Sequence, residues 1–289
     1  MMAAFNRAML CVAAFLCVAF VTPAQDLSAE TTALAEIIKT GNIEQKRDAL
    51  FTLRNIGSAE ASRAALPALN DKDPMVRATA AASVVFLSPT EAVSALSPLL
   101  NDRDPFVRRE AALALGTVRH SSATDALLNS LRRDRDAEAK TAAVIALGEI
   151  GDAKAAAPLT NILKNNPSEE DEMLRRSAAR SLGQIAFFSR TGRHYSITPQ
   201  NFLPEKFKEQ IESDAEKAAH LTVFQTALPI LAKVLNDARE ADDTRREAAF
   251  ALGAIGDKAS AAVLQKHLNS PDPYLAEICK EALLMIKTG

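Results

Sequence analysis

Cysteine is scarce in this sequence, and the positions of the few cysteines limit how the chain can be stabilised. There are three cysteines, and two of them, Cys11 and Cys17, lie within the first 24 residues. If that segment is removed as a leader, only Cys279 remains, and an intramolecular disulfide is excluded. An exported chain of this length must then be held together by side-chain packing, for which it is long enough.

Long apolar runs are also few. The one prominent run covers residues 8–21, follows the single charge of Arg7 and is shorter than the roughly 20 residues that cross a bilayer. Small residues follow it, so the pattern predicts a signal peptide over residues 1–24 with cleavage before Gln25. No second run is long enough for a membrane span after cleavage. The predicted location is therefore periplasmic or secreted.

The chain lacks an excess of charge of either sign. Without the leader it holds 33 basic and 36 acidic residues, and the two signs are interspersed. Nucleic-acid binding requires a basic stripe that can replace the counterions of the phosphates. No nucleic-acid partner is expected on this ground, which leaves a protein as the expected kind of partner.

What the chain does have is an internal repeat. The segment RREAALALG at Arg108–Gly116 returns as RREAAFALG at Arg245–Gly253, and weaker copies surround both. The copies start at Lys46, Arg77, Arg108, Lys140, Arg175, Arg245 and Ala276. The intervals of 31, 31, 32, 35, 70 and 31 residues indicate a period typical of a solenoid.

Each repeat is predicted to form two helices. In one copy Asp104 precedes Pro105, as an N-cap precedes the first residue of a helix, and a second helix is expected from about Ala123 to Leu131. Gly116 and the Gly-x-Ile-Gly segments at 148–151 and 253–256 are interpreted as helix terminators. The prediction is an all-α, right-handed solenoid of about seven helical hairpins over residues 25–289. It runs from a helix at 27–39 to one at 274–287.

Two motifs carry a family resemblance. Asp-x-Asp-Pro-x-Val-Arg at the start of a repeat and Ala-Leu-Gly-x-Ile-Gly at the end of its first helix resemble the HEAT-repeat family, in the short bacterial type named after the phycobilin lyases. The resemblance implies a binding scaffold. It also implies a ladder of acid–base pairs between successive repeats, at Asp73, Asp104, Asp136 and Asp243 with Arg77, Arg108, Lys140 and Arg245.

The family that the chain resembles also includes an enzyme, deoxyhypusine hydroxylase, which binds two irons through His-Glu dipeptides. None of the four histidines here precedes a glutamate, and no His-x-x-x-His or Cys-x-x-Cys pair occurs. Protein metal sites need several convergent ligands. The sequence therefore predicts no metal site, no cofactor and no catalytic residue.

The long interval contains an insertion predicted over residues 187–221. It combines five aromatic residues with arginine and histidine: Phe187, Phe188, Tyr195, Phe202 and Phe207. Two interpretations stay open, a decorative excursion packed back on the solenoid and a partner site, because long insertions and exposed aromatics beside arginine both occur at interfaces. If the insertion binds a partner, the expected contact residues are Arg193, His194, Tyr195 and Phe202. The ridge of second helices would then support them as an adjoining surface.

The function predicted from the sequence is that of a non-enzymatic exported scaffold or adaptor. It would bind a protein partner through its solenoid surface and the insertion at 187–221. The alternative is a lyase-like chaperone or enzyme that acts on a prosthetic group or a modified side chain.

Overall fold

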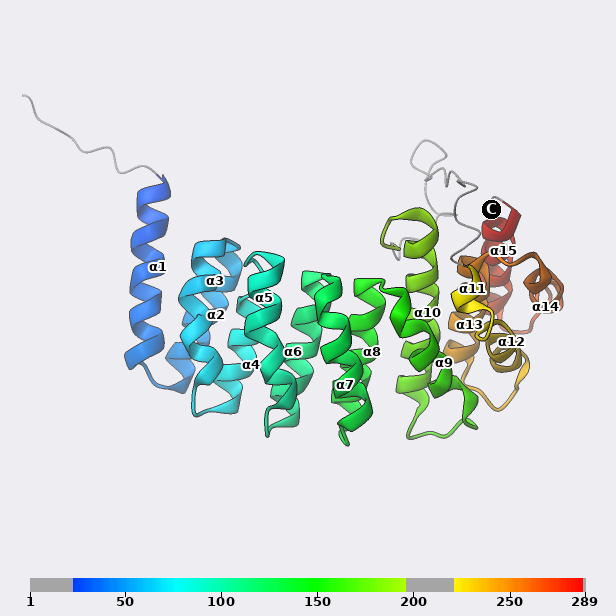
Figure 1. The fold of residues 1–289 in the computed structure, drawn as a ribbon, viewed down its shortest axis with the longest axis horizontal. Helices are drawn as coiled ribbons and strands as arrows, with labels where there is room; N and C mark the ends of the chain where they lie inside the picture. The colour runs from blue at the N-terminus through cyan, green and yellow to red at the C-terminus, as the bar shows by residue number, and fades with distance from the viewer. Residues whose placement is uncertain (1–22, 196–220, 288–289) are drawn as a thin grey trace, which may run out of the picture.

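The computed structural model describes residues 23–195 and 221–287, and over these ranges the chain forms fifteen α-helices and no strand. Figure 1 shows the helices standing side by side in a row from α1 at one end to α15 at the other. The predicted all-α solenoid is confirmed. It is built from an initial helix, α1 (Pro23–Thr40), and six helical hairpins, and it closes on α15.

The first helices of the hairpins form one layer, because each packs on the next along the row. They are α2 (Ile43–Ile56), α4 (Pro74–Ser83), α6 (Pro105–Val118), α8 (Ala137–Ile150), α10 (Glu172–Thr191) and α13 (Asp242–Ile255), followed by α15 (Pro273–Lys287).

The second helices form the other layer and are shorter, often with a 3₁₀ turn at one end. They are α3 (Ala59–Ala65), α5 (Pro89–Leu96), α7 (Thr124–Arg133), α9 (Ala156–Lys164), α11 (Leu221–Phe224) with α12 (Leu228–Asn236), and α14 (Ala261–Gln265). The predicted second helix near residues 123–131 thus corresponds to α7.

One continuous apolar core runs between the two layers. In α6, Val107, Ala111 and Leu115 form a stripe that is completely buried. These positions recur at helical spacing, so each first helix turns the same stripe towards its second helix and its neighbours. The small residues of this stripe allow neighbouring first helices to approach closely. The larger leucines fill the space between the layer of first helices and the layer of second helices.

The glycines in the first helices have two different roles, which corrects the sequence interpretation. Gly151 and Gly256 do end helices, in left-handed backbone conformation with φ of 79° at each. Gly116 and Gly253 lie inside their helices instead. A Cβ atom on Gly253 would lie 2.5 Å from Cα of Ala282 in the next first helix, so this glycine sets the close approach of α13 and α15. Gly148 is likewise internal.

Aspartates and basic residues do form a ladder, but among the described residues only Asp243, of the predicted acids, pairs with a base of the preceding repeat, Arg176 of α10, at 2.9 Å. Asp73 and Asp104 are N-caps, and Asp73 accepts hydrogen bonds from the backbone N–H groups of Met75 and Val76. The ladder acids lie two residues before these caps, directly after the second helix or the 3₁₀ turn that continues it: Asp71, Asp102 and Asp134. Asp136 is also an N-cap, and Arg246 rather than Arg245 pairs with Asp272.

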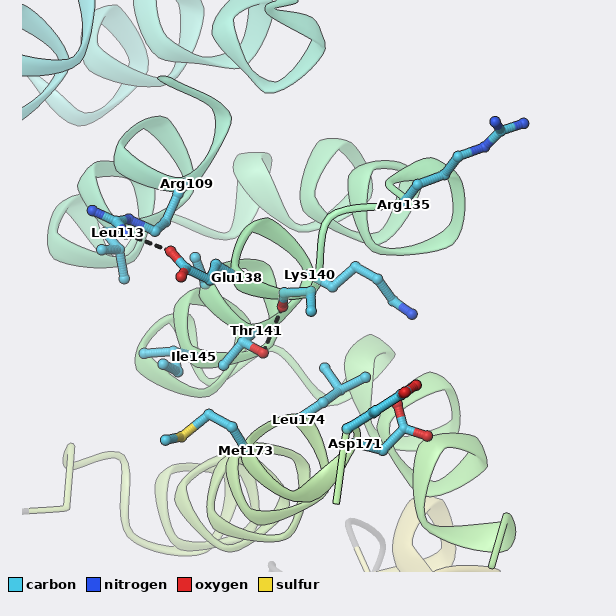
Figure 2. A pocket seen from close by; sticks show the side chains of 13 residues that line it. Arg109, Leu113, Arg135, Glu138, Lys140, Thr141, Ile145, Asp171, Met173 and Leu174 are labelled. Atoms are coloured by element: carbon cyan, nitrogen blue, oxygen red, sulfur yellow. Dashed lines mark hydrogen bonds and ion pairs between the residues drawn. The ribbon is translucent and has the colours of Figure 1, made fainter. Parts of the chain in front are cut away.

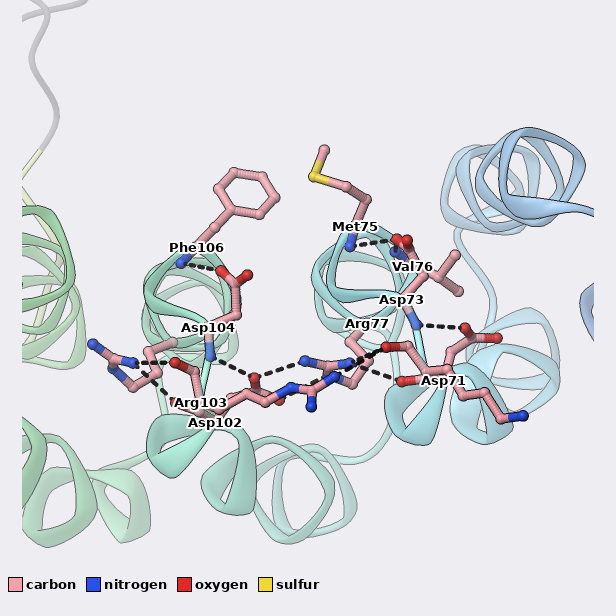
Figure 3. A network of polar contacts seen from close by, with 11 residues as sticks. Asp71, Asp73, Met75, Val76, Arg77, Asp102, Arg103, Asp104 and Phe106 are labelled. Atoms are coloured by element: carbon pink, nitrogen blue, oxygen red, sulfur yellow. Dashed lines mark hydrogen bonds and ion pairs between the residues drawn. The ribbon is translucent and has the colours of Figure 1, made fainter.

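Figure 3 shows how one ladder residue joins two repeats. Arg77 donates from Nε and Nη2 to both carboxylate oxygens of Asp102, each at 2.8 Å, and from Nη1 to the carbonyl oxygen of Asp71 at 2.8 Å. Its guanidinium therefore ties the loop before α4 to the loop after α5. Burial alone would raise the pKa of the Asp102 carboxyl, but the hydrogen bonds from Arg77 and from the backbone N–H of Asp104 outweigh it and hold that pKa below its ordinary value.

The insertion predicted over residues 187–221 begins as an extension of a helix. Helix α10 has 20 residues and continues to Thr191, whereas α8 and α13 have 14, and Phe187 is buried in the core. Phe187 remains part of α10 because its aromatic side chain completes the apolar stripe of that helix. Residues 196–220, with Phe202 and Phe207, lie outside the described residues. On the far side the chain continues with α11.

Candidate interaction surface

Large apolar side chains are exposed mainly on the layer of first helices. Among the described residues ten such side chains are exposed, and seven of them belong to first helices or to α15: Ile43, Phe51, Met75, Ile145, Met173, Tyr274 and Leu284. The second helices contribute only Val223 to the ten. A surface that gathers exposed apolar side chains on one side is typical of a binding face. We call this layer the first-helix face.

Part of this pattern follows the repeat. The residue two positions before the ladder base is Met75, Phe106 and Met173 in three of the repeats, and Tyr274 takes the same place in α15. Figure 3 shows Met75 and Phe106 pointing in the same direction, away from the ladder. The repeat therefore places these side chains at matching points along the face.

Arginines stack on two of these rings. The guanidinium carbon of Arg109 lies 4.6 Å from the ring centre of Phe106, and that of Arg246 lies 5.1 Å from the ring centre of Tyr274. Cation–π contacts of this kind hold both the ring and the arginine in place. Aromatic and arginine side chains are the residue types that dominate the binding energy of protein interfaces.

A groove with a volume of about 440 Å³ crosses this face over α6, α8 and α10. In Figure 2, Ile145 of α8 and Met173 of α10 stand at its mouth, with 37% and 58% of their surfaces exposed. Leu113 and Leu174 line it, and an ion pair of 2.6 Å between Arg109 and Glu138 borders it. The groove thus offers an apolar floor with a charged rim.

The groove lies where the repeat spacing changes. From Lys140 to Arg175 the chain uses 35 residues, against 31 in the earliest repeats. The extra residues lengthen the loop between α9 and α10, and Asp171 at the end of that loop lines the groove. On the α8 side the lining residues Thr141 and Ala142 are small and fill little of the space.

The partner residues predicted from the insertion have different surroundings. The ring of Tyr195 packs against Phe187 and Phe250, with ring centres 5.4 and 4.4 Å apart, and burial raises the pKa of its hydroxyl. His194 stacks on Phe188 at 4.5 Å, and burial lowers its pKa.

The start of the insertion is therefore held against α10 and α13. Arg193 is exposed beside these two rings, whereas Phe202 is outside the described residues. The structure brings Arg193, His194 and Tyr195 together. Their binding of a partner stays a prediction.

Sequence reasoning missed the groove and its residues. Ile145 and Met173 each resemble an ordinary apolar residue of an amphipathic helix when they are considered singly. The available signal was the repeat itself, because aligning the copies places Met75, Phe106 and Met173 at one position that the core stripe does not use. An apolar residue at a position off the stripe is the one that reaches the surface.

Within the two ranges that the structure covers, no group of three or more His, Cys, Asp or Glu side chains is placed to hold a metal ion. None of the helices in those ranges combines the length and the apolar character that a bilayer crossing requires.

Two family models match the sequence. A model of HEAT repeats matches residues 31–116 and 124–191, which together exceed half of the chain, and a model of the PBS lyase HEAT-like repeat matches residues 107–133 and 244–270. No curated protein matches the sequence.

Among solved structures, the chain is similar to an engineered protein of the Northeast Structural Genomics Consortium, with 23% identity, a TM-score of 0.53 and coverage of 92% of this chain and 70% of the other. It is also similar to the CpcE–CpcF complex of phycocyanin lyase from Nostoc sp. PCC7120 (19% identity, TM-score 0.48, coverage 89% and 94%). Human deoxyhypusine hydroxylase in complex with glycerol aligns with 21% identity and a TM-score of 0.35, over 92% of this chain and 99% of the other. At 23% identity the likeness to the engineered protein is one of fold.

Proposed function

The chain belongs to the HEAT-repeat family, and on that premise we propose that it is a non-enzymatic scaffold that binds a protein partner on its first-helix face. The observation that supports this proposal is the gathering of exposed apolar side chains on that face, accompanied by arginines stacked on Phe106 and Tyr274. Such a surface provides apolar contact area and directional donors at the same time. The groove lined by Ile145 and Met173 lies on this face.

The insertion contributes to the same proposal. Arg193, His194 and Tyr195 leave α10 beside α13, whose Phe250 receives the ring of Tyr195. These residues follow the last turn of α10, whereas the groove is lined by its first turn at Met173 and Leu174, so a partner would meet both by lying along α10. In this arrangement Tyr195 positions the segment, and Arg193 and His194, with Phe202 further along the chain, make contact.

A charge placed at the mouth of the groove tests the proposed face. We expect Met173→Asp to weaken partner binding by about tenfold or more, because a carboxylate would then be desolvated in an apolar contact. The partner is first captured from an envelope extract with the unchanged protein and identified by mass spectrometry, and its Kd is then measured with each variant.

The matched control is Val223→Asp, which changes an exposed apolar residue of a second helix. This variant is expected to bind as the unchanged protein does, and circular dichroism should show both variants folded. Equal Kd values for both variants would contradict the proposed face. A purified protein that carries a chromophore or a metal would favour the alternative of a lyase-like chaperone or an enzyme.

We further propose that the scaffold acts outside the cytoplasm, in the periplasm or as a secreted protein. The support is the apolar run at residues 8–21 with one preceding charge and small residues after it. We expect the exported protein to begin at Gln25, and N-terminal sequencing of material from the envelope or the medium measures this directly. Exported protein that still began at Met1 would overturn the cleavage prediction.

A further inference from the structure

The ladder changes at one junction. In the first three hairpins an aspartate directly follows the second helix or the 3₁₀ turn that continues it, and its carboxylate binds the base of the first helix: Lys46 with Asp71, Arg77 with Asp102 and Arg108 with Asp134, at 2.6 to 2.8 Å. In the fourth hairpin the base is Lys140, and the residue that follows α9 is Asn165. An amide stands where three repeats have a carboxylate.

Neighbouring acids do not replace the missing carboxylate. Among the described residues Lys140 forms no ion pair within 4 Å, and Asp171 accepts a hydrogen bond from the Ser168 hydroxyl at 3.1 Å. The carbonyl oxygen of Asn165 accepts from Nη1 of Arg175 at 2.8 Å, as the carbonyl of Asp71 does from Arg77. The backbone at this junction therefore keeps the ladder geometry, and only the carboxylate differs.

Open space lies beside the same residues. A cavity of about 520 Å³ is lined by Lys140 and Asn165 together with apolar side chains of the two flanking second helices and α10, among them Leu131, Pro158, Ile162 and Leu174. Arg132, Arg175 and Asp171 also line it, so two arginines and one carboxylate share the cavity with Lys140. Lys140 and Leu174 line the groove of Figure 2 as well, so the two spaces flank one junction.

We propose that this junction binds an acidic side chain of the protein partner, with the partner's carboxylate on Lys140 in the place that Asp71, Asp102 and Asp134 hold in the other hairpins. The proposal rests on the proposed function and names a recognition element for it. The chain itself shows three times which chemical group fits this position. A charge-assisted hydrogen bond between an ammonium and a carboxylate in a half-buried site is stronger than one between neutral groups. The apolar walls would receive the residues beside the acid.

The probe for this site is N-acetyl-glutamic acid methylamide, with the glutamine compound as its neutral counterpart. We expect titration of the isotope-labelled full chain to shift backbone amide resonances around residues 140, 165 and 174, with a Kd about tenfold or more lower for the acid than for the amide. Lys140→Met should remove this preference for the acid. The control Lys154→Met changes an exposed lysine paired with Asp125 at 3.5 Å and should leave the preference unchanged.

A second variant places a carboxylate of the chain itself beside Lys140. Asn165→Asp should form the fourth ladder pair, raise Tm by about 2 to 4 °C and lose the preference for the acid probe, because the internal carboxylate competes for Lys140. The rise in Tm should vanish when Lys140→Met is added. Equal affinity for the two probes would overturn the proposal, as would Asn165→Asp without a change in Tm or in probe preference. Since the probe replaces the partner, these results are independent of the Met173→Asp test of the first-helix face.

Discussion

Arg175→Met is expected to lower the free energy of unfolding by about 3 to 5 kcal/mol, the typical cost of removing one partner from a buried ion pair. The side chains of Arg175 and Glu240 are 2% and 4% exposed, and Nε of Arg175 donates to Glu240 at 3.2 Å. Without the arginine, the Glu240 carboxylate would stay buried without its cation. Arg175 also donates to backbone carbonyls at the end of α9, so its loss leaves buried acceptors unpaired.

The pair has a special place in the chain, because it joins residues on the two sides of the interruption between Thr191 and Leu221. Urea unfolding measures the effect, and Lys46→Met is the matched control. Its ion pair with Asp71 is more exposed than the Arg175–Glu240 pair, at 19% and 16%, and its loss should cost about 1 kcal/mol or less. The double variant Arg175→Met with Glu240→Leu should recover much of the loss. A double variant no more stable than Arg175→Met would contradict this account.

Leu115→Ala is expected to lower the free energy of unfolding by about 2 to 5 kcal/mol, since it removes a fully buried side chain and leaves a cavity. Leu115 lies on α6, which packs against both α4 and α8, so the cavity would touch two junctions. Urea unfolding followed by circular dichroism provides the measurement. Because each repeat contacts only its neighbours, unfolding is expected to depart from two-state behaviour, with the central repeats affected first.

Two controls accompany this variant. Thr117→Ala changes an exposed residue of the same helix, and His267→Ala removes a half-buried imidazole that contacts Asn236 at 2.8 Å. Both should change the free energy of unfolding by about 0.5 kcal/mol or less. If Leu115→Ala were as mild as these controls, the assignment of the core stripe would be wrong.

Local features of the fold were predictable from the sequence because they depend on residues close together in the chain. Asp104 and Pro105 begin α6 as expected, since an N-cap needs only the next two or three backbone N–H groups. The helical stripe of Val107, Ala111 and Leu115 followed from spacing alone. The repeat period predicted that copies of this unit would stack into a solenoid, and they do.

Contacts between repeats could not be predicted from the sequence in the same way. Asp102 and Asp104 carry the same side chain and lie on either side of Arg103 in the sequence, and only the packed junction shows that Asp102 meets Arg77 while Asp104 caps its own helix. The internal Gly253 resembles the terminal Gly256 in the sequence, yet it is the neighbouring helix with Ala282 that requires it.

The sequence by itself determined the repeat, the helical hairpins, their caps and the core stripe, because periodicity and capping are properties of short stretches of chain. Tertiary structure decided which carboxylate pairs with which base, where α10 ends, which apolar residues reach the surface, and that Asn165 stands opposite Lys140. Each of these depends on the distance between side chains that are about 25 or more residues apart or on the burial of a side chain by its neighbours, and both are set only when the repeats are stacked.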